Sequence, residues 1–519
     1  MNSSHTLIRH VGAVSFATLI SRILGYVRDA LVAYAFGGGR FTDAFYAAFR
    51  LPNLFRRLLG EGSLTAAFVP IFSEHISNDR QDAARECFQA LFTLLLTVLF
   101  SIVVLGMFFA PQVTHLVAWG FKSDPDLFDL TVRLTRQIFP FLLFVSLAAL
   151  ASGSLNSLGH FFVPSVAPAM LSVAEITFVL LIAKSCSDPL QGLAVSAVAG
   201  GLLHFGLLVP LLYKEKMPLV WRWNPLHPDI RRVGKALLPA VWGMSLDQVN
   251  AFIDTICASF LITGSVTALY NSNRLMQFPL ALFGIAMSTA ALPNLSASAA
   301  KQDWPAMKNT LNLALRLILF AVLPAMAGLI LLGRPAIELL FEHGKFTHRE
   351  TLLTNAALAM YCLGLPAFAG VKVLASFFYA LKDTKTPVKV ANACLLINIT
   401  GNLTLMWKFG VAGLAIATSL ASTANAFILF HLLRRRLGLM GGRRIFKTFL
   451  QCAAALFPMM LAAGGIAYGL TGSLIWRVPA AVLVGTAAYL GTAKLLRMEE
   501  FQHLRNALTG SPDPRETPQ

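Results

Sequence analysis

Apolar segments long enough to cross a lipid bilayer recur along the whole chain, and this feature limits the possible fold more than any other. A membrane-spanning helix needs about 20 mostly apolar residues. Of the 519 residues, 56% are hydrophobic and only 13% are charged, whereas soluble domains carry about 25% charged residues. The sequence therefore predicts an all-α polytopic membrane protein with about fourteen transmembrane helices, at residues 11–36, 42–70, 87–110, 128–153, 161–183, 190–213, 233–263, 266–297, 309–333, 351–380, 387–408, 411–433, 448–470 and 474–496.

The basic residues are distributed unevenly between the predicted loops. If successive helices alternate in direction, 24 Lys and Arg residues lie on one side of the membrane and 8 on the other. Loops rich in Lys and Arg stay in the cytoplasm, so both termini are predicted to be cytoplasmic. The net charge of +17 is thus explained largely by orientation in the membrane, and we expect no nucleic-acid partner.

The sequence contains an internal repeat. Residues 43–74 resemble residues 267–298, and Arg50 aligns with Arg274 at an offset of 224. Other matches fall at similar offsets, namely Thr65 with Thr289, Pro140 with Pro366 and Pro164 with Pro387. Apolar helices can resemble one another through composition alone, but the nearly constant offset favours a duplication.

An even number of helices in each copy would keep both copies in the same orientation, as in transporters built from parallel repeats. The predicted parts are an N-terminal six-helix lobe at 1–215, a C-terminal six-helix lobe at 230–436, two additional helices at 447–498 and a cytoplasmic tail at 499–519. The two additional helices lie outside the duplication and need an explanation of their own.

Beyond the 32 Lys and Arg residues counted with the loops and span ends, ten fall inside the predicted spans, five of them in the first two. A charged side chain at the centre of a bilayer costs about 2.5–3.5 kcal/mol on insertion scales. Arg133 and Arg316 are near predicted helix ends, so we expect both to extend toward the membrane surface. Arg22 and Arg28 lie near the middle of the first span and require a polar cavity or a partner.

Several charged residues recur at helical spacing. Asp43, Arg50 and Arg57 are seven residues apart and would share one face of an uninterrupted helix, although Pro52 disturbs that register. The ion pairs expected from this arrangement join Asp29 with an arginine, Asp43 with Arg28 or Arg50, and Glu61 with Arg57. In the second half, Asp247 and Asp254 also share a face and form a candidate cation site.

The basic groups in the spans outnumber the acidic ones. Six acids of the spans enter this comparison, namely Asp29, Asp43, Glu61, Glu175, Asp247 and Asp254, and their complete pairing with the ten basic residues leaves about four cations in excess. An excess of cations around a cavity suits an anion, and the planar arginine side chain binds phosphate groups through two hydrogen bonds. The pattern predicts a site for a phosphate or diphosphate, while purely structural ion pairs are the alternative.

Sequence motifs for chemistry on a substrate are missing. The six cysteines have neither metal-ligand spacing nor the pattern of a disulfide framework. The glycines at 37–39 favour a tight turn over a phosphate-binding loop, because no strand precedes them. Candidate catalytic side chains gather only in the loop at 334–350, namely Glu338, Glu342, His343 and His348. We therefore expect neither a cofactor nor a metal, and an enzyme is a remote alternative.

Several motifs in order carry a family resemblance: SRILGYVRD (21–29), TDAFYAAFRLPNLFRRLLGEG (42–62), AFVPIFSE (67–74), LNSLGHFFVPSVAP (155–168), LFEHGKF (340–346) and ALKDTKTPVKVAN (380–392). Together they resemble the MurJ (MviN) lipid II flippases of the MOP exporter superfamily over nearly the whole chain. The resemblance implies a protein of the bacterial inner membrane that moves lipid II, an undecaprenyl-diphosphate carrying a disaccharide-peptide, from the inner to the outer leaflet.

The resemblance also implies roles for individual residues. The arginines that would contact the substrate are Arg22, Arg28, Arg56 and Arg274, and the acidic residues that would lie near the gates are Asp29, Asp43 and Glu61. By their spacing, Arg50 and Arg57 join the gate or ion-pair group. The two helices at 447–498 would form a groove for the lipid tail. The expected partners are lipid II, membrane lipids and the cell-wall synthesis machinery, and a monomer is expected because the repeat already supplies two halves.

Three other functions remain open at this point. A flippase for another polyprenyl-diphosphate-linked glycan, such as an O-antigen unit, would share the two-lobed design. A drug or cation antiporter would also share it, but we expect acidic rather than basic residues in its cavity. A membrane enzyme acting on the same lipid would depend on the acidic and histidine side chains of 334–350.

Overall fold

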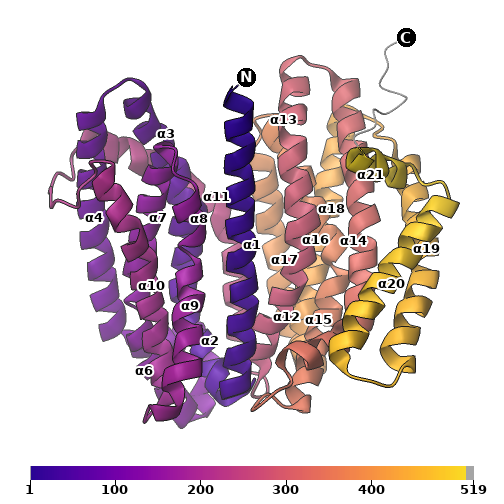
Figure 1. Ribbon diagram of the computed structural model, residues 1–519, viewed down its shortest axis with the longest axis horizontal. Coiled ribbons are helices and arrows are strands. Elements are labelled where there is room, and N and C mark those ends of the chain that lie inside the picture. Colours follow the sequence, from indigo (N-terminus) through magenta and orange to yellow (C-terminus); the bar gives the residue numbers. More distant parts are fainter. Residues whose placement is uncertain (1, 510–519) are drawn as a thin grey trace. The chain divides into compact units, whose positions relative to one another are not determined.

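The computed structural model describes the backbone of residues 2–509, and the side chains of 2–16, 59–62, 240, 242–247 and 507–509 lie outside the described part (Figure 1). Every regular element within 2–509 is a helix. The chain divides into two compact units, Met1–Thr267 with His343–Thr347, and Ala268–Glu342 with His348–Gln519. The predicted lobe boundaries stay a prediction. The first unit extends beyond residue 230, where the second predicted lobe begins.

The helices of the first unit are α1 (Asn2–Phe36), α2 (Arg40–Phe55), the π-helix η1 (Arg56–Ser63), α3 (Leu64–Ser77), α4 (Gln81–Phe108), α5 (Ala110–Val117), the 3₁₀ helix η2 (Trp119–Ser123), α6 (Pro125–Ile138), α7 (Phe141–Ser157), α8 (Phe162–Val166), α9 (Ala169–Thr177), the π-helix η3 (Phe178–Ile182), the 3₁₀ helix η4 (Ala183–Ser185), α10 (Pro189–Lys214) and α11 (Pro228–Ser259). The turn between α1 and α2 contains Gly37 with a φ of 80°, which confirms the tight turn predicted for the three glycines. Phe68 and Phe72 of α3 pack with Phe88 of α4 and Leu147 of α7 in its largest described core.

The remaining elements are α12 (Ser265–Pro279), which begins at the end of the first unit, the π-helix η5 (Leu280–Ile285), α13 (Ala286–Ala300), α14 (Trp304–Phe341), α15 (His348–Leu363), α16 (Leu365–Ala380), α17 (Lys385–Phe409), α18 (Val411–Leu437), α19 (Gly442–Gly469), α20 (Leu474–Leu495) and α21 (Glu499–Thr509). The predicted additional helices correspond to α19 and α20, which lie side by side (Figure 1). Gly485 allows their close approach, because a Cβ there would lie 3.0 Å from the Cβ of Ala463. Small residues serve the same purpose at many membrane helix contacts.

The prediction of a helical membrane protein is confirmed, whereas the number fourteen stays a prediction. Among the described residues, nine helices are long and apolar enough to cross a membrane, or ten if α15 and α16, which are bent by 44°, count as one span. The four other predicted spans coincide with α1, α2–η1–α3, α8–α9–η3 and α11. Most of the candidate charged residues lie in these four spans. The less apolar helices thus contain most of the residues predicted to serve the function.

The two copies of the internal repeat share an unusual backbone feature. The π-helix η1 starts at Arg56 and η5 starts at Leu280, which is the offset of 224 derived from the sequence. A nearby proline precedes each of them, Pro52 inside α2 and Pro279 at the end of α12. Proline removes a backbone donor, and π-helical turns often mark functional sites. The wider turn also moves Arg57 out of the α-helical register predicted with Asp43 and Arg50.

Candidate functional site

The best-defined charged cluster of the first unit centres on Arg28 of α1. Its Nε and Nη2 atoms donate hydrogen bonds of 3.0 and 2.6 Å to Oδ1 of Asp29. Its Nε also lies 3.5 Å from Oε2 of Glu175 on α9. Both carboxylates are buried. The predicted pairing of Asp29 with an arginine is therefore confirmed, and Glu175 is a second acidic neighbour that sequence reasoning had not assigned to a pair.

The two arginines of the first span differ in their surroundings. Arg22 is exposed on α1, whereas only 11% of the Arg28 side chain is exposed. Six residues separate them, which corresponds to about 600° of helical rotation and hence different faces. On the same helix, Arg22 is therefore exposed, whereas Arg28 lies beside the carboxylates of Asp29 and Glu175.

Three further arginines lie at the junction of α2 and η1. Arg50, Arg56 and Arg57 are all half-buried. The Nε of Arg56 donates a hydrogen bond of 2.9 Å to Oδ1 of Asn53 one helical turn away, which orients its guanidinium. Glu61, the predicted partner of Arg57, has a side chain outside the described part.

Asp43 of α2 caps the start of α12. Its Oδ2 accepts a hydrogen bond of 2.6 Å from the backbone N–H of Gly264, and its Oδ1 accepts bonds from the backbone N–H and the hydroxyl of Thr267, at 2.8 and 2.7 Å. A carboxylate at a helix N-terminus satisfies free N–H groups and interacts favourably with the helix dipole. In the repeat, Thr267 is the residue equivalent to Asp43. The alignment pairs Asp43 with Thr267, and the structure places the two residues in contact.

Replacing Asp43 by alanine is expected to destabilise the start of α12, because three hydrogen bonds that fix it are lost. Asparagine retains one acceptor oxygen and removes the charge, so Asp43→Asn should keep part of the stability. The two variants are compared by their thermal unfolding midpoints in detergent. A midpoint of Asp43→Ala equal to that of the parent chain would contradict the importance of this cap.

The predicted acidic pair of the second half is described only in part. Asp254 on α11 is buried, while the side chain of Asp247 lies outside the described part. Arg274 on α12 is half-buried. The candidate cation site therefore stays a prediction.

The prediction that Arg316 extends toward the membrane surface is wrong. Arg316 on α14 is 6% exposed and donates from Nε to Oε1 of Glu500 at 2.5 Å and from Nη2 to Oε2 of Glu499 at 2.7 Å. The Oγ1 of Thr448 on α19 also donates to Oε1 of Glu500, at 2.7 Å. Both glutamates belong to α21. Residues predicted to form a cytoplasmic tail therefore form ion pairs with an arginine of α14.

The candidate enzyme loop forms a compact charged corner. Potential ligand atoms of Glu338, Glu342 and His348 lie within 4.8 Å of one another. Each also contacts a residue outside this trio, since Arg334 donates to Glu338 at 2.8 Å, Thr351 donates to Glu342 at 2.6 Å, and Arg334 Nη2 lies 3.3 Å from His348 Nε2. These contacts describe an ion-paired corner at the surface.

Asp383 explains one of the quoted motifs, ALKDTKTPVKVAN. Its carboxylate accepts hydrogen bonds from the backbone N–H of Thr386 at 3.0 Å, the Thr386 hydroxyl at 2.7 Å and Nη1 of Arg436 at 2.6 Å. Burial opposes ionisation, but these bonds and the Arg436 charge outweigh it and lower the Asp383 pKa to about 2. The motif therefore joins the start of α17 to the end of α18 through a carboxylate that is ionised at neutral pH.

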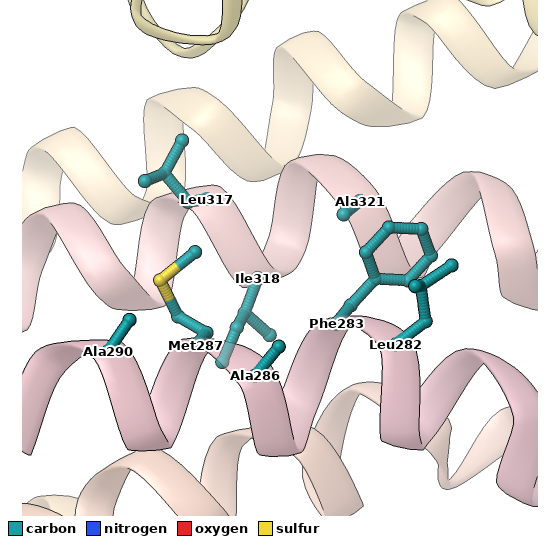
Figure 2. A pocket seen from close by; sticks show the side chains of 8 residues that line it. All are labelled: Leu282, Phe283, Ala286, Met287, Ala290, Leu317, Ile318 and Ala321. Carbon is teal, nitrogen blue, oxygen red and sulfur yellow. The ribbon is translucent and has the colours of Figure 1, made fainter. Parts of the chain in front are cut away.

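A cavity of about 230 Å³ in the second unit has an entirely different character (Figure 2). Its walls are apolar side chains of η5, α13 and α14, among them Phe283, Met287 and Ile318. No charged side chain lines it, so it is unsuited to a diphosphate.

Known proteins resemble this chain over most of its length. The family model described as "Lipid II flippase MurJ" matches residues 32–483. A protein of Burkholderia cenocepacia named lipid II flippase MurJ is 38% identical over 434 residues, covering 83% of this chain and 84% of that protein. A probable lipid II flippase MurJ of Vibrio cholerae is 36% identical over 485 residues, covering 92% and 90%.

Solved structures agree with these sequence matches. A lipid II flippase MurJ in an inward closed conformation superimposes with a TM-score of 0.78 at 27% identity and covers 93% of this chain and 98% of that chain. An inward-facing multidrug resistance MATE transporter of the MOP superfamily has a TM-score of 0.70 at 13% identity, covering 81% and 95%, and shares the fold alone. On the family model and the relatives together, the chain belongs to the lipid II flippase MurJ family.

Proposed function

We propose that this protein flips lipid II from the inner to the outer leaflet of the bacterial cytoplasmic membrane by alternating access. The observation that carries the proposal is family membership combined with the arginines that lie within the helices of the chain. The arginines assigned to the substrate are Arg22, Arg28, Arg56 and Arg274. The protein acts as a transporter rather than an enzyme and uses no cofactor.

Arginine suits the anionic centre of this substrate. A guanidinium forms two parallel hydrogen bonds with a phosphate group and stays charged at every physiological pH. Arg28 is held by Asp29 but lies 3.5 Å from Glu175, which is longer than a normal charged hydrogen bond. A diphosphate can therefore replace the weaker partner, Glu175, without disrupting the contact with Asp29.

Movement of the head group needs gates and a driving force. We assign gate or ion-pair roles to Asp29, Asp43, Arg50, Arg57 and Glu61, and keep Asp247 and Asp254 as a candidate cation site. Moving one charge through a membrane potential is worth about 2.3 kcal/mol per 100 mV. A potential that is negative inside favours the outward movement of an anion.

The proposal also includes the orientation of the protein in the membrane, its lipid groove and its partners. Both termini face the cytoplasm, α19 and α20 form the groove for the undecaprenyl tail, and the chain works as a monomer in contact with membrane lipids and the cell-wall synthesis machinery. These assignments rest on the distribution of basic residues, on the helix pair outside the repeat and on the family resemblance.

Complementation tests the substrate. In a bacterial host depleted of its own lipid II flippase, expression of this chain is expected to restore growth and the exposure of lipid II on the outer leaflet. Immunoblotting of membranes controls for abundance. A chain that inserts normally and fails to restore either property would overturn the assignment and favour another polyprenyl-diphosphate-linked glycan.

A further inference from the structure

A non-helical segment between α10 and α11, residues 215–227, lies along the outside of α4. We call it the Trp strap. The Nε of Arg85 donates to the carbonyl of Lys216 at 2.9 Å, Gln89 donates to the carbonyl of Pro218 at 3.3 Å, and the N–H of Arg222 donates to Thr93 Oγ1 at 2.9 Å. Arg85 and Thr93 are eight residues apart on α4, so the strap follows this helix for about 12 Å.

The strap covers the face that α4 would otherwise expose. Every residue from 87 to 93 of α4 is buried, and the exposed apolar residues of this helix begin at Val98 and continue to Phe108. An apolar exposed face of this kind contacts lipid in a membrane protein. The strap therefore lies directly beside the lipid-facing part of α4, on the side of its N-terminus.

The outer surface of the strap is aromatic. Trp221 and Trp223 are 62% and 54% exposed, and their rings stack with centroids 6.5 Å apart and an interplanar angle of 12°. Leu226 is 90% exposed. The inner side is fixed, because Met217 is buried in the core of the first unit and Arg222 pairs with Glu86 at 3.0 Å. Exposed tryptophans on a fixed support suit the boundary between lipid tails and headgroups.

Exposed cations flank the aromatic pair. Lys214, Lys216, Arg231 and Lys235 are exposed, and none of them has an ion pair with another described side chain. Basic residues close to a membrane are attracted to an anionic lipid surface. The strap thus combines indole rings with free positive charge on one side of α4.

We propose that the Trp strap is an interfacial anchor, in which Trp221 and Trp223 insert among the headgroups and the flanking cations bind anionic phospholipid. This segment connects the two predicted lobes, so the anchor would keep the connecting segment at the membrane surface. The proposal does not depend on the identity of the transported lipid.

The test uses the full chain in nanodiscs. Leu226→Cys is labelled with a fluorophore in a Cys186→Ser background, because the other five cysteines are buried. Lipids brominated near the headgroup are expected to quench the label at least threefold more than aqueous iodide does. The ratio of quenching by brominated lipid to quenching by iodide should increase when half of the phosphatidylcholine is replaced by phosphatidylglycerol. Stronger quenching by iodide in both lipid mixtures would overturn the proposal.

A pair of double variants separates the anchor from general effects. Trp221→Ser with Trp223→Ser is expected to lose most of the quenching by brominated lipid. Trp407→Ser with Trp476→Ser removes two other exposed tryptophans, 69% and 78% exposed, and should leave the label unchanged. Size-exclusion profiles verify folding of both. Identical quenching in the two double variants would show that the indoles do not hold the strap in the membrane.

Discussion

Arg28→Ala is expected to reduce lipid II exposure by about tenfold to a hundredfold and to abolish rescue of growth. A hydrogen bond to a charged group contributes about 1.5–3 kcal/mol, and about 1.4 kcal/mol corresponds to a tenfold change. The substitution removes the group that we assign to the diphosphate. It also leaves Asp29 and Glu175 buried without their shared cation.

Loss of binding and loss of stability can be separated at this site. Glu175→Gln removes one carboxylate and retains Arg28, so it should preserve rescue. Arg28→Ala combined with Glu175→Gln relieves the uncompensated charge and should restore membrane abundance without restoring transport. Arg133→Ala is the matched control, because Arg133 is an exposed arginine of α6. Full transport by Arg28→Ala at normal abundance would refute the assignment to the substrate.

The sequence predicted the helices and their charged residues well because both signals are local. A run of apolar residues identifies a membrane span, and a charged residue within that run identifies a helix that needs a polar environment. The four predicted spans missing from the apolar set are α1, α2–η1–α3, α8–α9–η3 and α11. Three of them carry Arg28, Asp43 and Glu175. The offset of 224 derived from the repeat also separates the starts of the two π-helices, Arg56 and Leu280, although no π-helix was predicted.

Contacts between distant segments were harder to predict. Arg316 and Glu500 are 184 residues apart, and Glu500 follows the last span in a segment without an apolar run. The position of Arg316 near a predicted helix end favoured a side chain that extends toward the membrane surface. Instead, α21 packs against α14 and places the carboxylates of Glu499 and Glu500 beside the guanidinium. The role of Asp43 depended similarly on where the chain placed Gly264 and Thr267.

Arg316→Ala is expected to destabilise the second unit by about 3–5 kcal/mol, the usual cost of stranding one partner of a buried ion pair. The Glu500 side chain is only 1% exposed, and Oε1 already accepts from both Arg316 and Thr448. Without the guanidinium this buried carboxylate loses the ion pair described for it. A lower thermal unfolding midpoint in detergent and faster proteolysis at α21 are the expected readouts.

The adjacent glutamates provide the matched comparison. Glu499 is 44% exposed and Glu500 is 1% exposed, yet both contact Nη2 of Arg316. An exposed ion pair contributes about 0–1 kcal/mol, so Glu499→Gln should change the unfolding midpoint little and Glu500→Gln should lower it clearly. Arg316→Met with Glu500→Leu replaces both charges by apolar groups and should recover most of the loss. Equal effects of the two single glutamine variants would show that burial of Glu500 does not determine how α21 is held.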